Sequence, residues 1–482
     1  AGEGLAETNL VPGRNKYREI PIVIQDRSFN ADGSLFYPDN RAFFEGLNVA
    51  GTAGTPDAQF PGAPELQIDL DPATSDIAPI WNPEAFFNTM VVNGVSWPNL
   101  EVAPAQYRFR LLNGCNSRFL NLALKVSNPA DNTKAVPRTV YLTKANGKIN
   151  RTTTPIRELN FFQIGAEQSL LPHPVAISTG FATELLSAAA VNEDRTIVAP
   201  VPAPSAQQAL LMGLAERADV IVDFRGLPDG TVITMTNTAP DAPFGGFPDV
   251  PADPSTTGQV MQFVVNSALL GASPTDELRD KATGVITNPG TAASNPEALV
   301  VDAEALENFT VAVTNPTPRE LALVEEESAL ICADVDLAGN VIQVPGLTPV
   351  AGACVDGNGA PSPTALPFAP KAAVLGTVDG AGQPSVTLWS DPIATNPNAD
   401  GSGAQTAETW NIWNFTVDGH PIHIHLVKFS VLGRAAIGGG PSVVTTPTGT
   451  QAWENGWKDT VISYPGEITS VAADFDINGL YV

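Results

Sequence analysis

Three of the four histidines in this chain stand within six residues, in the segment His420-Pro-Ile-His423-Ile-His425. Imidazole is the commonest metal ligand near neutral pH, and scatter rarely gathers three such groups. The flanking runs 410–417 and 426–431 are strand-like, so we expect the three side chains on or between strands. The segment therefore predicts a metal site.

The spacing of the histidines separates one of them from the other two. His423 and His425 are two residues apart and share one face of an extended segment, whereas His420 precedes His423 by three residues. At about 3.3 Å per residue, His420 starts roughly 10 Å from His423. Ligands of one ion need nitrogens within about 4 Å of each other, given bonds of about 2.0–2.1 Å. We expect His420 to serve a different metal from the pair, which shares one ion or supplies two neighbouring ions.

The cluster has two other interpretations, a set of hydrogen-bonded core histidines and a zinc site. Burying three imidazoles without partners is costly, which favours a metal over the first. His173 lies between two prolines and is predicted to be a surface or structural residue. For Asp418 the alternatives are a residue that orients His420, one that faces a substrate, and a turn residue. For Asp459 they are an anchor for a metal ligand and a structural hydrogen bond.

The rest of the chain predicts an all-β fold. Its 482 residues include 43 prolines and 41 glycines, with strand-like runs between them. Helical candidates are short and lie at 182–191 and 205–214. We expect two Greek-key β-sandwich domains.

A stretch rich in Gly, Pro, Ser, Thr and Asn marks the boundary between these domains. The expected division is an N-terminal linker at 1–16, a domain at 17–270, a linker at 271–300 and a domain at 301–482. The second domain carries a loop-rich insertion at about 339–370.

The charge balance limits the partners. Asp and Glu outnumber Lys and Arg by 51 to 25, for a net charge of −26. Nucleic acids and anionic membranes attract clustered basic residues, so we expect neither as a partner. A cationic or neutral partner is favoured instead.

The three cysteines leave one unpaired if two are joined. Cys332 and Cys354 are either a disulfide or two free thiols, and a loop of this length would gain about 3 kcal/mol from closure. We expect the disulfide, and with it an exported protein in the periplasm, at the cell surface or outside the cell. Cys115 lies in an apolar run and is predicted to be buried.

The histidine segment, followed by Leu426-Val-Lys-Phe429, resembles the copper motif in the third domain of multicopper oxidases, most closely in the bacterial laccase and bilirubin-oxidase branch. Further motifs that resemble those of the family occur in the family's order along the chain, at 19–29, 32–38, 92–98, 107–119, 163–165, 215–220 and 456–460. Loops aside, the resemblance covers most of residues 17–482.

This resemblance implies two cupredoxin-like domains, the second and third of a three-domain enzyme. By motif position, it implies that His420 ligates a type 1 copper, His423 a type 2 copper and His425 a type 3 copper. In this family the type 1 copper takes electrons from a small reductant, and a trinuclear cluster reduces dioxygen to water. The implied partners are dioxygen and a phenolic, amine, tetrapyrrole or metal-ion reductant.

The sequence also departs from the family pattern. No His-x-His pair occurs before His420, and no His-Cys-His segment follows it, although a blue copper site needs a thiolate. We therefore expect a fragment of an oxidase, truncated at both ends and unable to assemble either copper centre alone. The alternatives are a non-catalytic metal-binding cupredoxin-like protein and a structural secreted β-sandwich protein.

Overall fold

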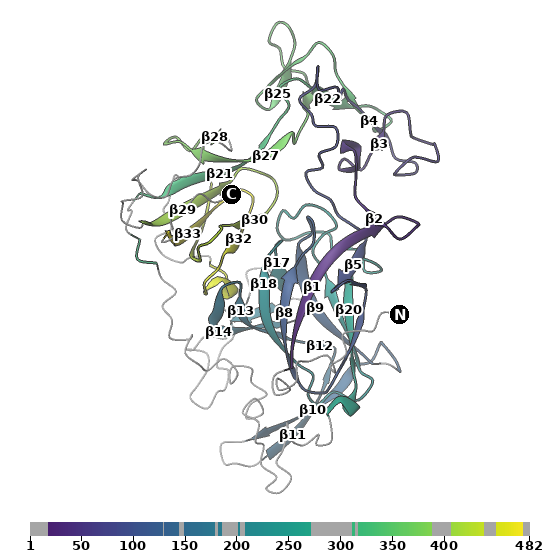
Figure 1. The fold of residues 1–482 in the computed structure, drawn as a ribbon, viewed down its shortest axis with the longest axis vertical. Helices are drawn as coiled ribbons and strands as arrows, with labels where there is room; N and C mark the ends of the chain where they lie inside the picture. The colour runs from purple at the N-terminus through teal and green to yellow at the C-terminus, as the bar shows by residue number, and fades with distance from the viewer. Residues whose placement is uncertain are drawn as a thin grey trace.

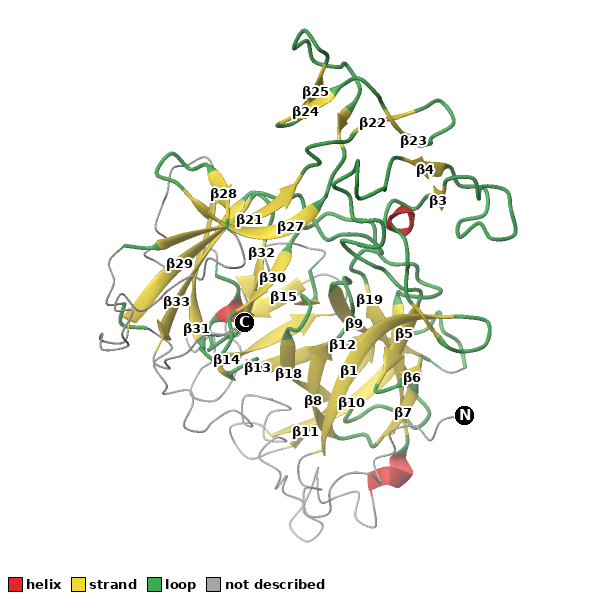
Figure 2. Ribbon diagram, turned by 45° about the horizontal axis from the view of Figure 1, so that its top comes forward, coloured by secondary structure: helices red, strands yellow, loops and turns green. Residues whose placement is uncertain are grey.

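The computed structural model describes residues 18–128, 130–143, 149–178, 182–185, 201–202, 208–270, 311–313, 317–387, 406–437 and 450–475. Within these ranges the regular structure is β-strand apart from three short 3-10 helices, η2 (Arg41–Phe43), η4 (Ser267–Leu270) and η8 (Ala452–Glu454) (Figure 2). No helix in the described part of the chain is long and apolar enough to cross a membrane. The predicted all-β class is confirmed.

A ten-stranded mixed sheet forms one layer of the first sandwich (Figure 1). From edge to edge its strands are β16 (Val201–Pro202), β15 (Ala182–Leu185), β14 (Ser169–Ser178), β13 (Phe161–Ala166), β18 (Arg217–Asp223), β8 (Gln106–Asn113), β1 (Arg18–Phe29), β5 (Thr89–Val92) and β6 (Val95–Ser96), with β2 (Leu35–Phe36) paired to β1. The neighbours β1 and β8 run parallel, although 76 residues lie between the end of β1 and the start of β8. Three other strands of this sheet, β2, β5 and β6, come between them in the chain.

 The chain therefore crosses over between layers here, as Greek-key sandwiches require.

A six-stranded sheet forms the facing layer. Its strands run in the order β12 (Glu158–Leu159), β9 (Leu120–Ser127), β19 (Val232–Asn237), β20 (Gln259–Val265) and β7 (Asn99–Val102), with β17 (Leu210–Met212) paired to β9. One apolar core joins the two layers, with Ile22 and Phe109 from the first sheet and Leu124 and Phe263 from the second. This shared core makes the two sheets one sandwich.

Strand β1 shows why these sequences take these places. Ile20, Ile22 and Ile24 alternate with more exposed residues and are buried. A period of two puts every second side chain on the same face, so the three isoleucines line the core side of the sheet. The aromatic side chains of Phe109 and Phe263 meet there with ring centroids 5.2 Å apart.

The second sandwich is built on another six-stranded sheet. Its strands run in the order β28 (Pro384–Val386), β27 (Ala372–Val378), β21 (Arg319–Glu326), β29 (Thr406–Asn414), β33 (Glu467–Phe475) and β31 (Phe429–Ala436). A two-stranded ribbon, β30 (His420–His423) and β32 (Thr460–Ser463), packs against it. Ile412, Phe429 and Val471 of the sheet share a core with Val461 of the ribbon.

A small third unit combines two segments that lie far apart in the sequence. Its five-stranded sheet has the order β26 (Leu366–Pro367), β22 (Cys332–Val335), β23 (Val341–Gln343), β4 (Glu65–Gln67) and β3 (Asn48–Val49), and the hairpin β24 (Thr348–Val350) and β25 (Ala353–Val355) lies beside it. Figure 1 shows this unit at one end of the molecule. Across it, the Glu65 backbone N–H donates to the Asn340 side chain at 2.9 Å.

This pairing joins the predicted insertion at 339–370 to residues assigned above to the first domain. The boundaries 17–270 and 301–482 themselves stay predictions. The linkers expected at 1–16 and 271–300 lie outside the described residues.

The two helical predictions are wrong where the structure describes them. Residues 182–185 form β15 and residues 210–212 form β17, while β10 (Val136–Thr143) and β11 (Ile149–Ile156) form a further hairpin. Short apolar runs do not distinguish a helix from a buried strand by periodicity. Leu210, Leu211 and Met212 are all buried because β17 is covered on both sides.

Cys332 and Cys354 form a disulfide in the small unit, as predicted, and Cys115 is buried. We predict that Cys332→Ala/Cys354→Ala lowers the free energy of unfolding of this unit by about 3 kcal/mol, because the bridge restricts its unfolded chain. Limited proteolysis with mass spectrometry would show faster cleavage within 331–368. Adding reductant should reproduce this cleavage in the parent chain but change nothing in the double variant; cleavage unaffected by either treatment would contradict the prediction.

Candidate metal centre

The histidine segment lies on the ribbon at the junction of the two sandwiches (Figure 1). Its strand β30 pairs antiparallel with β32, with His420 opposite Ser463 and His423 opposite Thr460. All four residues of β32 are buried, so the ribbon has a fixed inner strand. On the other side, the Gly419 N–H donates to the Phe244 carbonyl of the first sandwich at 2.7 Å.

His420 is half-buried, and its Nε2 lies 2.6 Å from the Thr416 hydroxyl oxygen. The single hydroxyl proton of Thr416 is accepted by Asn414 Oδ1 at 2.7 Å. The arrangement is therefore satisfied when His420 Nε2–H donates to Thr416, which leaves a lone pair on Nδ1. Burial lowers the pKa of His420, so the neutral, ligand-competent imidazole is favoured.

His423 is held through its other ring nitrogen. Its Nδ1 lies 2.8 Å from the backbone carbonyl oxygen of Asp459 and 3.2 Å from Thr460 Oγ1. A carbonyl oxygen only accepts, so Nδ1–H donates and Nε2 keeps its lone pair. Metal-binding histidines are commonly oriented by such a bond from the second ring nitrogen.

His425 lies beside His423 but beyond the end of β30. Their ring centroids are 5.1 Å apart and their planes are inclined by 65°. The sequence argument placed both on one face of a strand; instead, the strand ends at His423 and Leu426 takes a positive φ of 65°. The predicted closeness of the pair is confirmed, and the chain turns directly after it, at Leu426.

Asp459 lies directly before β32, contacts His423 through its backbone carbonyl, and accepts hydrogen bonds from three side chains. Its Oδ2 accepts from Gln168 Nε2 and Arg217 NH2, both at 2.5 Å, and its Oδ1 accepts from Thr460 at 2.8 Å. Burial would raise its pKa, but these hydrogen bonds lower the pKa of Asp459 to about 2. The carboxylate is ionised at neutral pH and ties His423 to the first sandwich.

Lys458, one residue earlier, is a fully buried cation. Its ammonium lies 2.5 Å from Glu167 Oε2 and 3.2 Å from Glu216 Oε1, both from the first sandwich. Burial raises the pKa of Glu167 to about 7 against the opposing effect of Lys458. Despite its own burial, Lys458 has a raised pKa because the surrounding carboxylates favour its charged form.

Asp418 contributes its backbone to the same network. Its carbonyl oxygen accepts from the Asn414 amide at 2.7 Å and lies 3.1 Å from the Thr416 hydroxyl oxygen, in the turn before His420. Its carboxyl has a raised pKa because of burial. Nearby Glu84 has its pKa raised to about 8, mainly by burial and then by Asp418 and Glu325.

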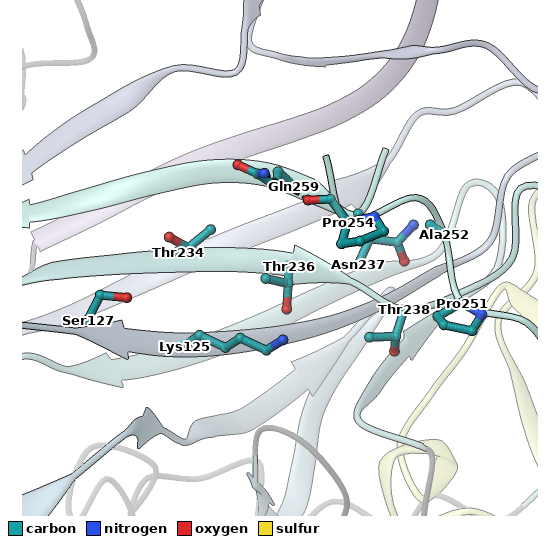
Figure 3. A pocket seen from close by; sticks show the side chains of 11 residues that line it. Lys125, Ser127, Thr234, Thr236, Asn237, Thr238, Pro251, Ala252, Pro254 and Gln259 are labelled. Atoms are coloured by element: carbon teal, nitrogen blue, oxygen red, sulfur yellow. Dashed lines mark hydrogen bonds between the residues drawn. The ribbon is translucent and has the colours of Figure 1, made fainter. Parts of the chain in front are cut away.

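Other features lie apart from the histidines. A groove of about 400 Å³ covers the outer side of β9, β19 and β20, where Figure 3 shows Lys125, Thr234, Thr236 and Gln259 around it. Its lining includes no imidazole, so it is separate from the candidate metal centre. The side chain of His173 lies outside the described residues.

The donor chemistry fits copper or another imidazole-binding metal only in part. His423 and His425 present two adjacent imidazoles, and neutral imidazole suits copper and zinc. Within the described ranges, however, no three His, Cys, Asp or Glu side chains are arranged to hold one ion. Cys115, outside the disulfide, is buried and its thiol pKa is raised by burial, which disfavours a thiolate there.

Comparison with known proteins identifies the segment that carries the histidines. Residues 368–482 match the family model described as multicopper oxidase. This segment is therefore similar to multicopper oxidase domains. The resemblance seen in the motifs is therefore confirmed, and multicopper oxidases are oxidoreductases whose family implies copper.

Relatives extend the likeness to the multicopper oxidases over nearly the whole chain. A laccase of Bacillus subtilis (strain 168) is 27% identical over 481 residues, which cover 96% of this chain and 58% of the laccase. A multicopper oxidase of Oryza sativa subsp. japonica, LPR1 homolog 5, is 26% identical over 74% of this chain and 35% of its own length. The chain thus spans less than two thirds of the length of these relatives.

Among solved structures, the McoA multicopper oxidase 2F4 variant from Aquifex aeolicus is 19% identical. It aligns with 96% of this chain and 60% of its own, with a TM-score of 0.43.

Sequence reasoning missed most of the residues that support the multicopper oxidase motif. Asn414 and Thr416 lie shortly before it, and Lys458 stands within the motif quoted above at 456–460. Glu216 and Arg217 stand within a motif quoted above at 215–220, which signalled them without indicating their contacts. Their partners are 242 residues away in the sequence.

Lys458 provides a test of the charged interface. We predict that Lys458→Met destabilises the chain by about 3 kcal/mol near pH 8, because Glu167 and Glu216 would stay buried without their cation. Because the folded-state pKa of Glu167 is raised to about 7, this carboxyl binds a proton more readily in the folded chain, so the loss should shrink as the pH falls below 7.

Chemical denaturation of both proteins between about pH 5 and pH 8 measures this difference, because this range includes the pKa of Glu167 at about 7. Lys125→Met is the matched control, because Lys125 is exposed on the outer side of β9. A deficit that grows as the pH falls would contradict the assignment.

Proposed function

We propose that this chain is part of a laccase-like, copper-dependent oxidase that oxidises a small reductant and reduces dioxygen to water. The observation that carries the proposal is His423, with Nδ1 bound to a carbonyl and Nε2 available beside His425, inside the segment that matches the multicopper oxidase model. Relatives over most of the chain, among them laccases, support it.

The three histidines take separate roles in this proposal. His420 ligates a type 1 copper, His423 a type 2 copper and His425 a type 3 copper. The separate hydrogen-bonding systems of His420 and His423 support two different centres, and the adjacent rings of His423 and His425 support one shared cluster. Copper, when bound, supplies the one-electron chemistry of the reaction.

The residues of this chain hold the imidazoles in their neutral forms and orient them. Thr416 fixes one nitrogen of His420, and the Asp459 carbonyl fixes one nitrogen of His423. The remaining ligands, including the thiolate of a blue copper site, come in our proposal from segments of the oxidase outside this sequence.

The reductant is a phenol, an aromatic amine, a tetrapyrrole or a metal ion, and the net charge of −26 favours cationic examples. All four methionines are buried in the core of the first sandwich, so none offers a surface thioether for cuprous ions. The disulfide between Cys332 and Cys354 supports an exported location, in the periplasm, at the cell surface or outside the cell.

Two substitutions in the complete oxidase test the roles. We predict that His420→Ala removes the blue absorbance and substrate oxidation, because the type 1 copper loses a ligand. His423→Ala should remove the type 2 signal in electron paramagnetic resonance and keep the blue absorbance. His173→Ala is the control and should keep both signals; retained blue absorbance in His420→Ala would refute its assignment.

A second candidate function is metal binding without turnover. The adjacent His423 and His425 favour it for the chain by itself, because the described residues offer this pair but no fuller ligand set. We predict that the isolated chain binds Cu²⁺ through this pair and consumes no oxygen with a phenolic reductant. Elemental analysis after dialysis and oxygen uptake decide this; a chain free of copper would instead favour a structural protein.

A further inference from the structure

We propose that Arg217 and Gln168, both in the first sandwich, are positioning residues for His423 of the second sandwich. The inference rests on the proposed function only for the metal that His423 would hold. The orientation of the ring itself is a property of the chain.

The first step is the short path from these residues to the imidazole. Arg217 and Gln168 both donate to Asp459 Oδ2, and the carbonyl oxygen of the same Asp459 accepts from His423 Nδ1. Thr460 closes the arrangement by donating to Asp459 Oδ1 while lying 3.2 Å from His423 Nδ1. Displacing Asp459 would therefore move the acceptor that orients the ring.

Arg217 is itself held in place before it reaches Asp459. Its NH1 donates to the Ala215 carbonyl at 2.8 Å, and its backbone N–H donates to Glu167 Oε1 at 3.1 Å. Ala215 has a positive φ of 61°, a conformation that few residues other than glycine adopt, and it forms the turn directly before Arg217. A planar guanidinium fixed at one end is suited to fixing a carboxylate at the other.

The contact between the two sandwiches does not depend on the hydrogen bonds from Arg217 and Gln168 to Asp459. Lys458 is buried between Glu167 and Glu216, and Ile462 packs with Phe119 and Phe244 of the first sandwich. The Arg217 side chain is 33% exposed, whereas Asp459 is 7% exposed. Removing Arg217 or Gln168 should therefore loosen Asp459 while the sandwiches stay docked.

The test follows the His423 tautomer in the full 482-residue chain labelled with ¹⁵N-histidine. The chain has four histidines, so long-range ¹H–¹⁵N spectra are simple, and His423→Gln assigns the signal. The parent chain should show one Nδ1–H tautomer in slow exchange. In Arg217→Met/Gln168→Leu we expect mixed tautomers and Nδ1–H exchange faster by about tenfold, in line with the loss of an orienting partner.

Three further variants separate positioning from structural support. Arg217→Lys keeps a cation and should retain part of the slow exchange, and Gln168→Leu alone, which keeps the ion pair, should show an intermediate rate. Arg110→Met is the matched control, because Arg110 pairs with Glu19 on the same sheet and should leave His423 unchanged. An unchanged tautomer and exchange rate in the double variant, or in Gln168→Leu and Arg217→Lys if the double variant does not fold, would overturn the proposal.

A Cu²⁺ titration of the same proteins distinguishes this inference from the proposed function. If His423 binds Cu²⁺, the double variant should bind it about 10–100-fold more weakly. A parent chain that does not bind Cu²⁺ counts against the proposed function, while the tautomer spectra still decide the positioning role.

Discussion

A buried cation at the junction of the two sandwiches is the constraint on which the candidate site depends. Lys458 belongs to the second sandwich, but its partners Glu167 and Glu216 belong to the first. A buried ammonium without carboxylates would be strongly unfavourable, so docking the sandwiches in any other register would carry a large cost. Since Asp459 follows directly in the chain, the same docking sets where the acceptor of His423 lies.

The constraint reaches His420 through the ribbon. Asn414 donates to the carbonyl of Ser463 on β32 at 3.0 Å and accepts from Thr416, whose hydroxyl meets His420. His423 Nδ1 contacts Thr460, at the other end of β32, and the carbonyl oxygen of Asp459 directly before it. Both imidazoles are thus held by one buried strand, although each has its own hydrogen-bonding system.

The sequence predicted what short spacing controls. The grouping of His420, His423 and His425, the disulfide and the strand-rich fold all follow from neighbours within a few residues or from the pairing options of three cysteines. Contacts over long separations had no such signal: β4 pairs with β23 across more than 270 residues, as the Glu65–Asn340 bond shows. The bend at Leu426 was missed because a leucine gives no warning of a positive φ.

Competition between protons and metal explains why these imidazoles need the surrounding fold. A histidine binds metal only when neutral, so a proton and an ion compete for the same lone pair. Burial lowers the pKa of His420, whereas His423 has one nitrogen committed to a carbonyl and the other left open. The local sequence His-Pro-Ile-His-Ile-His supplies the ligands, but Thr416, Asp459 and the first sandwich determine which nitrogen each ligand presents.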